Sequence, residues 1–243
     1  MEQHVKGQVV VLTGAGGGIG RATAVKLAQQ GMKTVMLGGT NLEKLRETQK
    51  LLPPDTESFL LPGDLTDMSF VAEAAERIIE RFGKIDVLIN NAGMALNCSF
   101  EEVTEEQFDK IMDINVKAPY FLTQKLLPHL KKSEYATIIN ISSVVGHAGY
   151  PYQSAYVASK HALLGFTKSL AREYYQDNIR VHAICPGGVY TDMVKIARPD
   201  LTDDGMILPE DIAEIIWFFL NHRGNAVVDE IIVHRVNKEP FLV

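Results

Sequence analysis

Short apolar runs rich in valine and isoleucine alternate along almost the whole chain with longer amphipathic segments. Strands that are apolar on both faces are typical of a parallel sheet covered by helices on both sides. The alternation therefore predicts an α/β fold: one doubly wound domain over residues 1–243, with a mostly parallel seven-stranded sheet. The expected strands are Val9–Thr13, Thr34–Leu37, Ser58–Leu61, Asp86–Asn90, Thr137–Ile141, Arg180–Cys185 and Glu230–Val233. The expected helices include Ile19–Gln30, Met68–Phe82, Glu105–Lys131, Ala155–Tyr175 and Asp211–Asn221.

Composition narrows the class of protein further. With 46% hydrophobic residues, 22% charged residues and a net charge of −6, the chain is typical of a soluble globular protein and offers no basic surface for nucleic acid. No apolar run reaches the roughly 18 residues that span a bilayer, and the N-terminus is not typical of a secretory signal. Its two cysteines, Cys98 and Cys185, and its seven histidines show no metal-ligand spacing. We therefore expect a cytoplasmic protein without a metal or membrane partner.

A glycine-rich turn, TGAGGGIG, connects the first expected strand to the first expected helix. Glycine at Gly14, Gly18 and Gly20 allows a tight turn, a close approach to a pyrophosphate and close packing of helix on strand. The helix N-terminus adds free N–H groups and a positive dipole end. A glycine-rich loop without chemical meaning is the alternative, but its place between strand and helix favours a dinucleotide site.

The stretch SAYVASK places Tyr156 four residues ahead of Lys160, on one face of a helix. A phenol has a pKa of about 10 and is a poor base at neutral pH, but a neighbouring cation lowers that value. Such a pair is most often a surface contact. Ser143 precedes Tyr156 by thirteen residues, at the end of an expected strand, where its hydroxyl can lie beside the phenol. The three side chains together indicate proton transfer to a carbonyl oxygen.

Six motifs in the same order resemble the short-chain dehydrogenases/reductases, in the single-domain branch of about 250 residues. They are the glycine-rich turn, NNAG at Asn90–Gly93, Asn115 in DINVKAPY, Ser143 in NISS, the YxxxK pair, and PGGVYTDM at Pro186–Met193. The resemblance covers residues 9 to about 193, and PEDIA at Pro209–Ala213 extends it. It implies a Rossmann-type fold and a hydride transfer between a nicotinamide and a ketone or secondary alcohol.

The resemblance also implies a role for each matching residue. Ser143 is expected to hydrogen-bond the substrate oxygen, Tyr156 to pass the proton, and Lys160 to bind the nicotinamide ribose. Asn115 is expected to hold a water that links Lys160 to solvent. The cofactor is expected to contact Gly14, Gly18, Ile19, Gly20, Thr40, Asp64, Leu65, Asn91, Ala92, Gly93, Tyr156, Lys160, Pro186, Val189 and Thr191.

The choice of nicotinamide cofactor depends on the end of the second strand, which reads LGGTNLEKL. Gly39 stands where relatives that prefer NAD carry Asp, and Thr40 stands where relatives that prefer NADP often carry Arg. Since no carboxylate repels a 2′-phosphate, and Thr40, Asn41 and Lys44 can donate to it, we favour NADP(H) over NAD(H). Gly17, where NADP enzymes of the family often carry a basic residue, argues the other way. Asp64 has a competing interpretation as a turn or cap residue.

The substrate is expected to be a small carbonyl or alcohol compound, contacted by side chains that follow strand ends. We expect residues 190–208 to form a substrate loop, with an ordinary surface loop as the alternative. The family commonly forms homodimers or homotetramers through two long helices. The C-terminal segment VVDEIIVHRVNKEPFLV departs from the DGG turn of many relatives. The expected substrate residues are Ser143, Val145, His147, Tyr152 and Tyr190.

Three functions remain open on the sequence. A carbonyl reductase or alcohol dehydrogenase is favoured, with a 3-oxoacyl-type reductase, a steroid or polyol dehydrogenase and a broad carbonyl reductase as its variants. A dinucleotide-binding sensor or scaffold without turnover is the alternative from another class, and the presence of Tyr156 and Lys160 disfavours it. An epimerase or dehydratase of the longer branch needs a further substrate domain.

Overall fold

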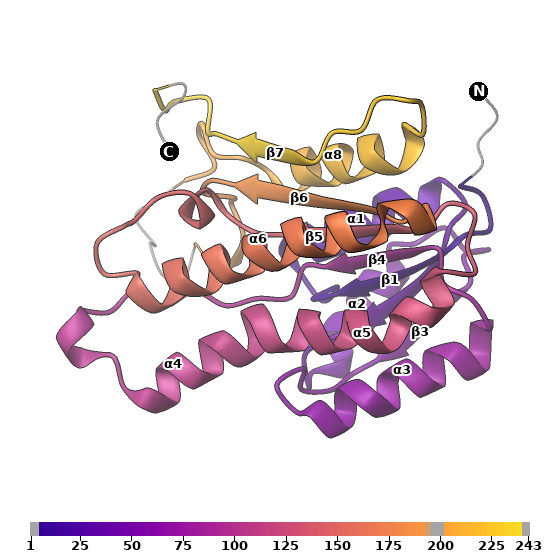
Figure 1. Ribbon diagram of the computed structural model, residues 1–243, viewed down its shortest axis with the longest axis horizontal. Helices are drawn as coiled ribbons and strands as arrows, with labels where there is room; N and C mark the ends of the chain where they lie inside the picture. Colours follow the sequence, from indigo (N-terminus) through magenta and orange to yellow (C-terminus); the bar gives the residue numbers. More distant parts are fainter. Residues whose placement is uncertain (1–4, 193, 195–201, 240–243) are drawn as a thin grey trace.

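The structure, a computed structural model, describes residues 5–192, 194 and 202–239. One seven-stranded sheet has the order β3-β2-β1-β4-β5-β6-β7, and every neighbouring pair is parallel (Figure 1). The predicted doubly wound α/β fold is confirmed, and the described sheet is parallel throughout. The strands are β1 (Val9–Thr13), β2 (Lys33–Leu37), β3 (Ser58–Leu61), β4 (Val87–Asn90), β5 (Thr137–Ile141), β6 (Arg180–Pro186) and β7 (Glu230–Val233).

Helices cover both faces of this sheet. The described α-helices are α1 (Gly18–Gln29), α2 (Leu42–Lys50), α3 (Met68–Phe82), α4 (Glu105–Met112), α5 (Ala118–Leu130), α6 (Ser154–Tyr174) and α8 (Pro209–Asn221). Helices α3, α5 and α6 lie on the face toward the viewer in Figure 1, and α1, α2 and α8 pack on the other face. None of the helices in the described ranges combines the length and apolarity needed to cross a bilayer.

Alternate residues of each strand enter one of two hydrophobic layers. In β1, Val10 and Leu12 pack with α1 and α8, whereas Val9 and Val11 pack with α3 and α5. This is the period-two alternation of a strand whose two faces are both buried. The apolar runs that looked continuous in the sequence therefore supply two cores at once.

The sequence was less informative about two of the helices. Helix α2 was not among the expected elements, because most of its residues are polar and only Leu45 and Thr48 are buried. The expected helix Glu105–Lys131 is divided: α4 and α5 are joined by a π-helical turn at Asp113–Lys117. Such turns widen a helix locally and often occur at functional sites.

Strand order reverses around β1, which lies between β2 and β4. The helices after β1 and β4 consequently leave the sheet in opposite directions and open a crevice at the carboxyl ends of these strands. Ligands of doubly wound folds bind at such a switch point. The glycine-rich turn follows β1 at this edge of the sheet.

Candidate active site

The glycine-rich turn keeps its shape because three positions lack a side chain. Gly14 and Gly18 have φ values of +71° and +50°, which disfavour L-residues. A Cβ on Gly20 would lie 2.1 Å from the Gly14 carbonyl oxygen, closer than any real contact. A Cβ on Gly18 would lie 2.9 Å from the Thr191 side chain, so this turn and the segment after β6 approach each other closely.

The N-terminus of α1 opens toward the same crevice. Gly17 caps the helix without a side-chain hydrogen bond, no acidic residue lies in the first turn, and a Cβ on Gly17 would meet nothing within 4 Å. The free N–H groups and the positive end of the helix dipole are therefore available to bind an anion. The residues present fit the pyrophosphate of a dinucleotide, which the turn from Gly14 to Gly20 would hold.

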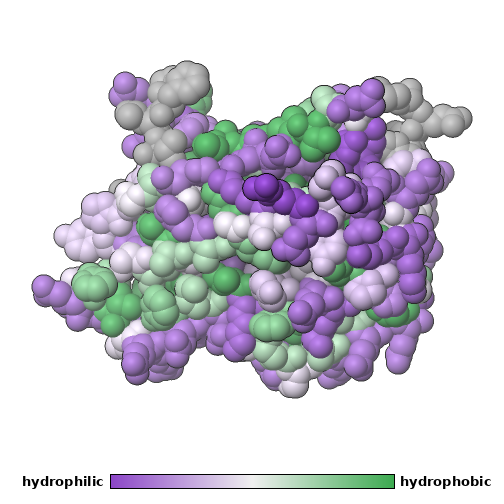
Figure 2. Space-filling view, viewed as in Figure 1, coloured by the Kyte–Doolittle hydropathy of each residue, from purple (hydrophilic) through white to green (hydrophobic). Residues whose placement is uncertain are grey.

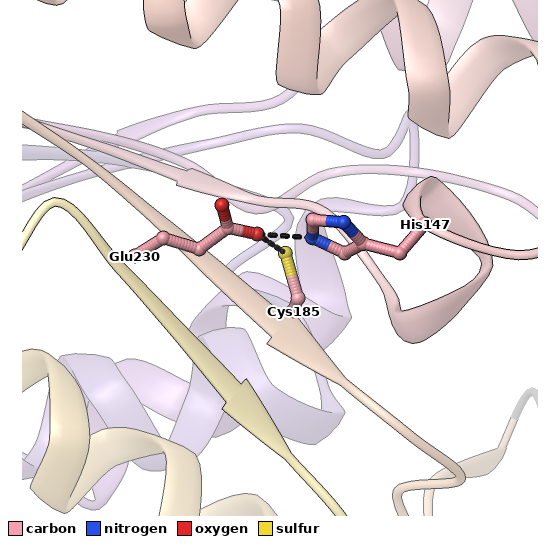
Figure 3. A group of neighbouring side chains, drawn as sticks. All are labelled: His147, Cys185 and Glu230. Carbon is pink, nitrogen blue, oxygen red and sulfur yellow. Dashed lines mark hydrogen bonds and ion pairs between the residues drawn. The ribbon is translucent and has the colours of Figure 1, made fainter. Parts of the chain in front are cut away.

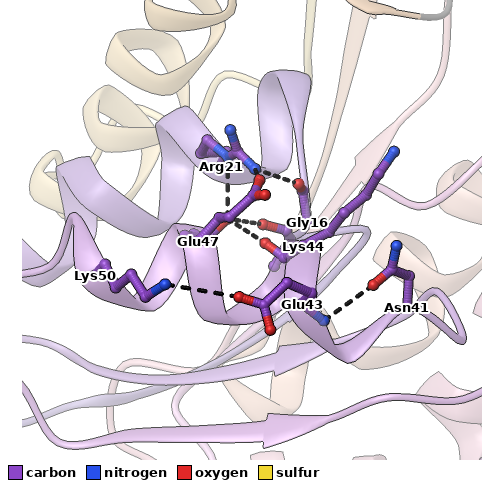
Figure 4. A network of polar contacts seen from close by, with 9 residues as sticks. Gly16, Arg21, Asn41, Glu43, Lys44, Glu47 and Lys50 are labelled. Carbon is purple, nitrogen blue, oxygen red and sulfur yellow. Dashed lines mark hydrogen bonds and ion pairs between the residues drawn. The ribbon is translucent and has the colours of Figure 1, made fainter.

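A polar network behind the turn holds it against α2 (Figure 4). The Arg21 guanidinium donates to the Gly16 carbonyl and to Glu47, both at 2.9 Å, and to the Thr48 hydroxyl at 3.1 Å. Thr48 in turn donates to the Ala15 carbonyl at 2.8 Å. These bonds satisfy backbone carbonyls that a tight turn leaves without helix or sheet partners.

The NNAG motif closes the opposite wall of the crevice. The backbone N–H groups of Asn91 and Ala92 both donate to the Thr13 hydroxyl at 2.9 Å, and the Asn91 side chain donates to the Thr13 carbonyl at 2.9 Å. A Cβ on Gly93 would lie 2.9 Å from the Asn115 side-chain oxygen. The end of β4 is thereby attached to the end of β1, as expected for two walls of one cofactor site.

The end of β2 has room for the adenosine end of a cofactor. Gly39 and Thr40 are exposed, Gly39 has a φ of +70°, and a Cβ there would meet nothing within 4 Å. In Figure 4 the Lys44 side chain extends away from the carboxylates of Glu43 and Glu47. The expected donors to a 2′-phosphate therefore lie at an open edge.

Asp64 and Leu65, expected to contact adenine, follow β3. One Asp64 carboxylate oxygen accepts from the Thr66 backbone N–H at 2.9 Å and from the Thr66 hydroxyl at 2.8 Å. This is the turn role that the sequence offered as the competing interpretation. Leu65 is buried and packs close to Gly38, so its side chain serves the core.

Ser143 and Tyr156 meet at the carboxyl end of β5. The Ser143 hydroxyl lies close enough to the Tyr156 phenol to act on its pKa. Ser143 is buried, and its hydroxyl also donates to the Pro186 carbonyl at 3.3 Å. The structure therefore brings together the two residues that the sequence assigned to the substrate oxygen.

Lys160 lies one helical turn beyond Tyr156 and is buried. Its ammonium donates to the Ile141 carbonyl at 2.9 Å and lies 5.8 Å from the centre of the Tyr156 ring. Burial lowers the pKa of Lys160 to about 8, although the neighbouring Cys185 acts in the opposite direction. The Lys160 side chain therefore remains mostly protonated at neutral pH. Its pKa of about 8 is nevertheless close enough to neutral pH that a small rise in pH removes part of its charge.

The expected lowering of the Tyr156 pKa is not what the structure shows. Burial raises the pKa of Tyr156 above its ordinary value, and the nearby Ser143 hydroxyl offsets only part of that effect. Removing a phenolate from water costs more free energy than its neighbours return, so the pKa moves upward. In this state the phenol holds its proton.

Asn115 lies in the π-helical turn and is buried. Its side-chain oxygen accepts from the Met94 N–H, and its side-chain nitrogen donates to the Met94 carbonyl and to the Ser159 hydroxyl, each at 2.9 Å. The Asn115 amide therefore joins the loop after β4 to α6, close to Lys160. Its expected role in holding a water remains a prediction.

The remaining expected substrate residues have different environments. Val145 is buried in the turn after Ser143, whereas Tyr152 is 66% exposed and has a φ of +64°. Tyr190 donates its N–H to the Ile207 carbonyl at 2.8 Å, which joins the two ends of the expected substrate loop. Residues 193 and 195–201 of that loop lie outside the described residues.

His147 interacts with residues that the sequence did not single out. Its ring contacts the Glu230 carboxylate, and the Cys185 thiol donates to the same carboxylate oxygen at 3.1 Å (Figure 3). Burial and the carboxylate raise the pKa of Cys185 to about 12. Burial also acts to raise the pKa of Glu230, but its bonds from Cys185 and His147 lower it overall.

The fold and this site together define a dinucleotide-binding α/β protein with a serine, tyrosine and lysine at the end of β5. The family model described as short chain dehydrogenase matches residues 8–202. The chain is 34% identical to the 3-oxoacyl-[acyl-carrier-protein] reductase FabG of Thermotoga maritima, over 94% of this chain and 96% of the relative. It is 35% identical to the 3alpha-hydroxysteroid dehydrogenase of Mediterraneibacter gnavus, over 96% and 97%.

Solved structures agree with these sequence relationships. Levodione reductase superimposes with a TM-score of 0.86 at 30% identity, over 95% of this chain and 96% of that one. A metagenomic short-chain oxidoreductase in complex with NADP gives a TM-score of 0.83 at 30% identity, over 95% and 98%. The chain belongs to the short-chain dehydrogenase family. It is an NAD(P)-dependent oxidoreductase that acts on carbonyl or alcohol groups.

Proposed function

We propose that Tyr156 is the proton donor and acceptor of this reaction, with Ser143, Lys160 and Asn115 as its partners. The observation that carries the proposal is the convergence of Ser143, Tyr156 and the buried Lys160 ammonium, which lies 5.8 Å from the centre of the Tyr156 ring. A bound nicotinamide supplies or accepts the hydride. Ser143 and Tyr156 hold the substrate oxygen, so that the developing alkoxide meets two hydroxyl donors at once.

The protonated phenol of Tyr156 suits the role of proton donor in carbonyl reduction. Because the pKa of Tyr156 is raised by burial, the phenol is protonated at neutral pH and can donate. Lys160, whose ammonium lies 5.8 Å from the ring centre, then stabilises the phenolate that remains. Asn115 fixes Ser159, one residue before Lys160, and so positions this part of α6.

The substrate class that we favour is a ketone with an apolar body. Support comes from relatives that act on such compounds, since one is a 3-oxoacyl reductase and another a hydroxysteroid dehydrogenase. A dinucleotide-binding sensor without turnover is the alternative. The sensor is disfavoured because Tyr156 and Ser143 lie close together, so that both hydroxyl groups can contact one substrate oxygen.

A substrate screen with Tyr156→Phe as the test variant examines this proposal. Reduced nicotinamide absorbance is followed with 3-oxoacyl thioesters, steroid ketones and small ketones, using both NADPH and NADH. Tyr156→Phe should lower kcat about 10³-fold, because general acid catalysis contributes about 10²- to 10⁴-fold. Cofactor affinity, measured by fluorescence titration, should stay within about threefold, since the nicotinamide ribose is bound mainly by Lys160.

Tyr175→Phe is the matched control, because Tyr175 lies 67% exposed just after α6. It should keep full activity. Unchanged activity of Tyr156→Phe would contradict the assigned role. Tight cofactor binding without turnover of any tested compound would favour the sensor instead.

We propose NADP(H) as the preferred cofactor. The proposal is supported by the open edge at Gly39 and Thr40, by the absence of a carboxylate at either position, and by the position of Lys44. One similar solved structure was determined with NADP.

We also propose that a second copy of the chain covers the face formed by α4, α5 and α6. Figure 2 shows apolar side chains gathered over these helices. Phe108, Tyr120 and Phe121 are exposed there, and the Tyr120 ring centre lies 5.2 Å from that of Phe121 and 5.0 Å from that of Phe166. Such a patch favours association of one chain with another.

Light scattering should give a mass of two or four chains for the unmodified protein. Tyr120→Glu should reduce that mass, because it places a charge in the apolar patch. A single-chain mass for the unmodified protein would contradict the proposal.

A further inference from the structure

Three side chains of ligand type converge from three separate segments. Cys185 comes from β6, Glu230 from β7, and His147 from the residue after the 3₁₀ turn that follows β5 (Figure 3). Their ligand atoms all lie within 4.8 Å of one another. We call this group the His–Cys–Glu cluster. Within the described ranges it is the one group of three such residues close enough to share a metal ion.

Sheet register and α6 together determine this convergence. Glu230 pairs with Ala183, two residues before Cys185, so both side chains lie on the same face of the sheet. That face packs against Leu164 of α6. Lys160 and Lys168, four residues to either side of Leu164, bring two ammonium groups to the same face of the helix.

The arrangement is not that of a cysteine nucleophile. In a cysteine–histidine pair the thiol gives its proton to the imidazole. Here one Glu230 oxygen accepts from the Cys185 thiol at 3.1 Å and contacts the His147 ring. The thiol proton is therefore directed at the carboxylate rather than at the imidazole, so the cluster requires another explanation.

We propose that the His–Cys–Glu cluster is a binding site for Zn²⁺ or a similar divalent transition metal. The ligands would be His147 Nε2, Cys185 Sγ and one Glu230 carboxylate oxygen, with the fourth position open to solvent. Nitrogen, sulfur and carboxylate oxygen are the ligand atoms of protein zinc sites. Bond lengths of about 2.0–2.3 Å place tetrahedral ligands about 3.3–3.8 Å apart, so ligand atoms within 4.8 Å of one another need only small side-chain movements.

The site is accessible from solvent, and the charges of its ligands match a divalent cation. The His147 and Glu230 side chains are 25% and 21% exposed, whereas Cys185 is buried behind them. A thiolate and a carboxylate together balance the charge of a divalent ion. Lys168 lies 4.0 Å from Glu230, where its charge opposes that of an entering metal, and Lys160 is the second cation near Cys185.

The proposed site is separate from the cofactor crevice but adjacent to the catalytic serine. Cys185 directly precedes Pro186, whose carbonyl accepts the Ser143 hydroxyl at 3.3 Å. None of the three ligands is needed for the proton transfer proposed above. The sequence predicted no metal site, because these residues are separated by tens of positions along the chain; the proposal revises that expectation and does not depend on the proposed function.

Cobalt titration of the chelator-treated full-length protein tests this site directly. One equivalent of Co²⁺ should produce the near-ultraviolet thiolate-to-cobalt charge-transfer band, and Zn²⁺ should abolish the band by displacement. Cys185→Ser should remove the band, while circular dichroism reports whether the fold is kept. His147→Gln and Glu230→Gln should each weaken Zn²⁺ binding at least tenfold in a competition titration. Lys168→Met should tighten it, because an opposing charge is removed.

Cys98→Ser is the matched control, since Cys98 is the other free cysteine and lies outside the cluster. It should leave the band and the affinity unchanged. Absence of the band in the unmodified protein would overturn the proposal, as would a band lost in Cys98→Ser but kept in Cys185→Ser. If Cys185→Ser fails to fold, His147→Gln at the solvent side decides: unchanged Zn²⁺ affinity in that variant also overturns the site.

Discussion

The site is shaped by different means on the two sides of the sheet, at β1 and β2 and at β5 and β6. At β1 and β2 the crevice is shaped by missing side chains, because Gly14 and Gly20 allow a backbone contact that a Cβ would block. At β5 and β6 it is shaped by buried polar side chains, among them Ser143 and Lys160. We refer to these as the backbone-built end and the side-chain-built end.

The pKa shifts follow the same division. At the side-chain-built end, burial is the largest cause of the shifts of Lys160, Cys185 and His182. Around β3, at the opposite edge of the sheet, the lowered pKa values of Glu57 and Asp67 arise mainly from hydrogen bonds to exposed carboxylates. We therefore expect cofactor binding to respond chiefly to steric changes at the backbone-built end. At the side-chain-built end, catalysis and stability should respond to charge and pH.

The largest effect on the backbone-built end is expected from Gly20→Ala. A Cβ there would lie 2.1 Å from the Gly14 carbonyl oxygen, so the turn must move away from its position at the helix N-terminus. We expect cofactor affinity to fall at least about hundredfold, because a pyrophosphate needs the close backbone approach. Fluorescence titration with NADPH measures the loss.

Gly17→Ala provides the matched control in the same turn. Gly17 has an extended φ of −174°, and its Cβ would meet nothing within 4 Å. Its affinity for NADPH should change less than about threefold. Equal losses in both variants would show that the turn tolerates no side chain at all, and the steric argument for Gly20 would be wrong.

A smaller effect is expected from pH at the side-chain-built end, through His182. This histidine is buried, stacks on Phe219 with ring centres 4.3 Å apart, and contacts the Val228 carbonyl at 2.7 Å. Burial lowers the pKa of His182 from 6.5 to about 4. Because the unfolded chain takes up the proton first, stability that is complete above pH 6.5 is lost as the pH falls toward 4.

Chemical denaturation at pH 7 and pH 5 measures this contribution. The free energy of unfolding should fall by about 2 kcal/mol from this residue alone, since one pKa unit corresponds to about 1.4 kcal/mol. His182→Gln should reduce the pH dependence by that amount, whereas His161→Gln, at an exposed position of α6, should leave it unchanged. The same pH dependence in His182→Gln and the unmodified protein would contradict the assignment.

The smallest effect is expected from Gly39→Asp, which introduces a charge into the backbone-built end. A carboxylate there repels a 2′-phosphate and can accept from a ribose hydroxyl, so the ratio of kcat/KM for NADPH to that for NADH should fall about tenfold. Steady-state kinetics with both cofactors give the ratio.

Gly39→Ala separates charge from backbone strain, because both variants occupy a φ of +70° that disfavours L-residues. It should lower stability slightly and leave the cofactor ratio unchanged. A ratio that is equal in Gly39→Asp and the unmodified protein would place the discriminating contact elsewhere.

Much of the fold could be predicted because local rules govern it. Apolar runs bounded by turns indicated all seven strands, with bounds within one residue of those observed. The spacing of Tyr156 and Lys160 also placed both correctly on one helix. Helix α2 was missed because its polar sequence buries few side chains, and the division of Glu105–Lys131 was missed because a π-helical turn leaves no simple periodicity.

The sequence by itself determined the strands, the glycine-rich turn and the identity of the serine, tyrosine and lysine, since each depends on neighbours within a few positions. Only the tertiary structure decided the direction of the Tyr156 pKa, because burial is a property of the packed chain. It also decided the His–Cys–Glu cluster, whose contacts join residues 45 and 83 positions apart. Such contacts follow from strand register and from the packing of α6, which no short stretch of sequence encodes.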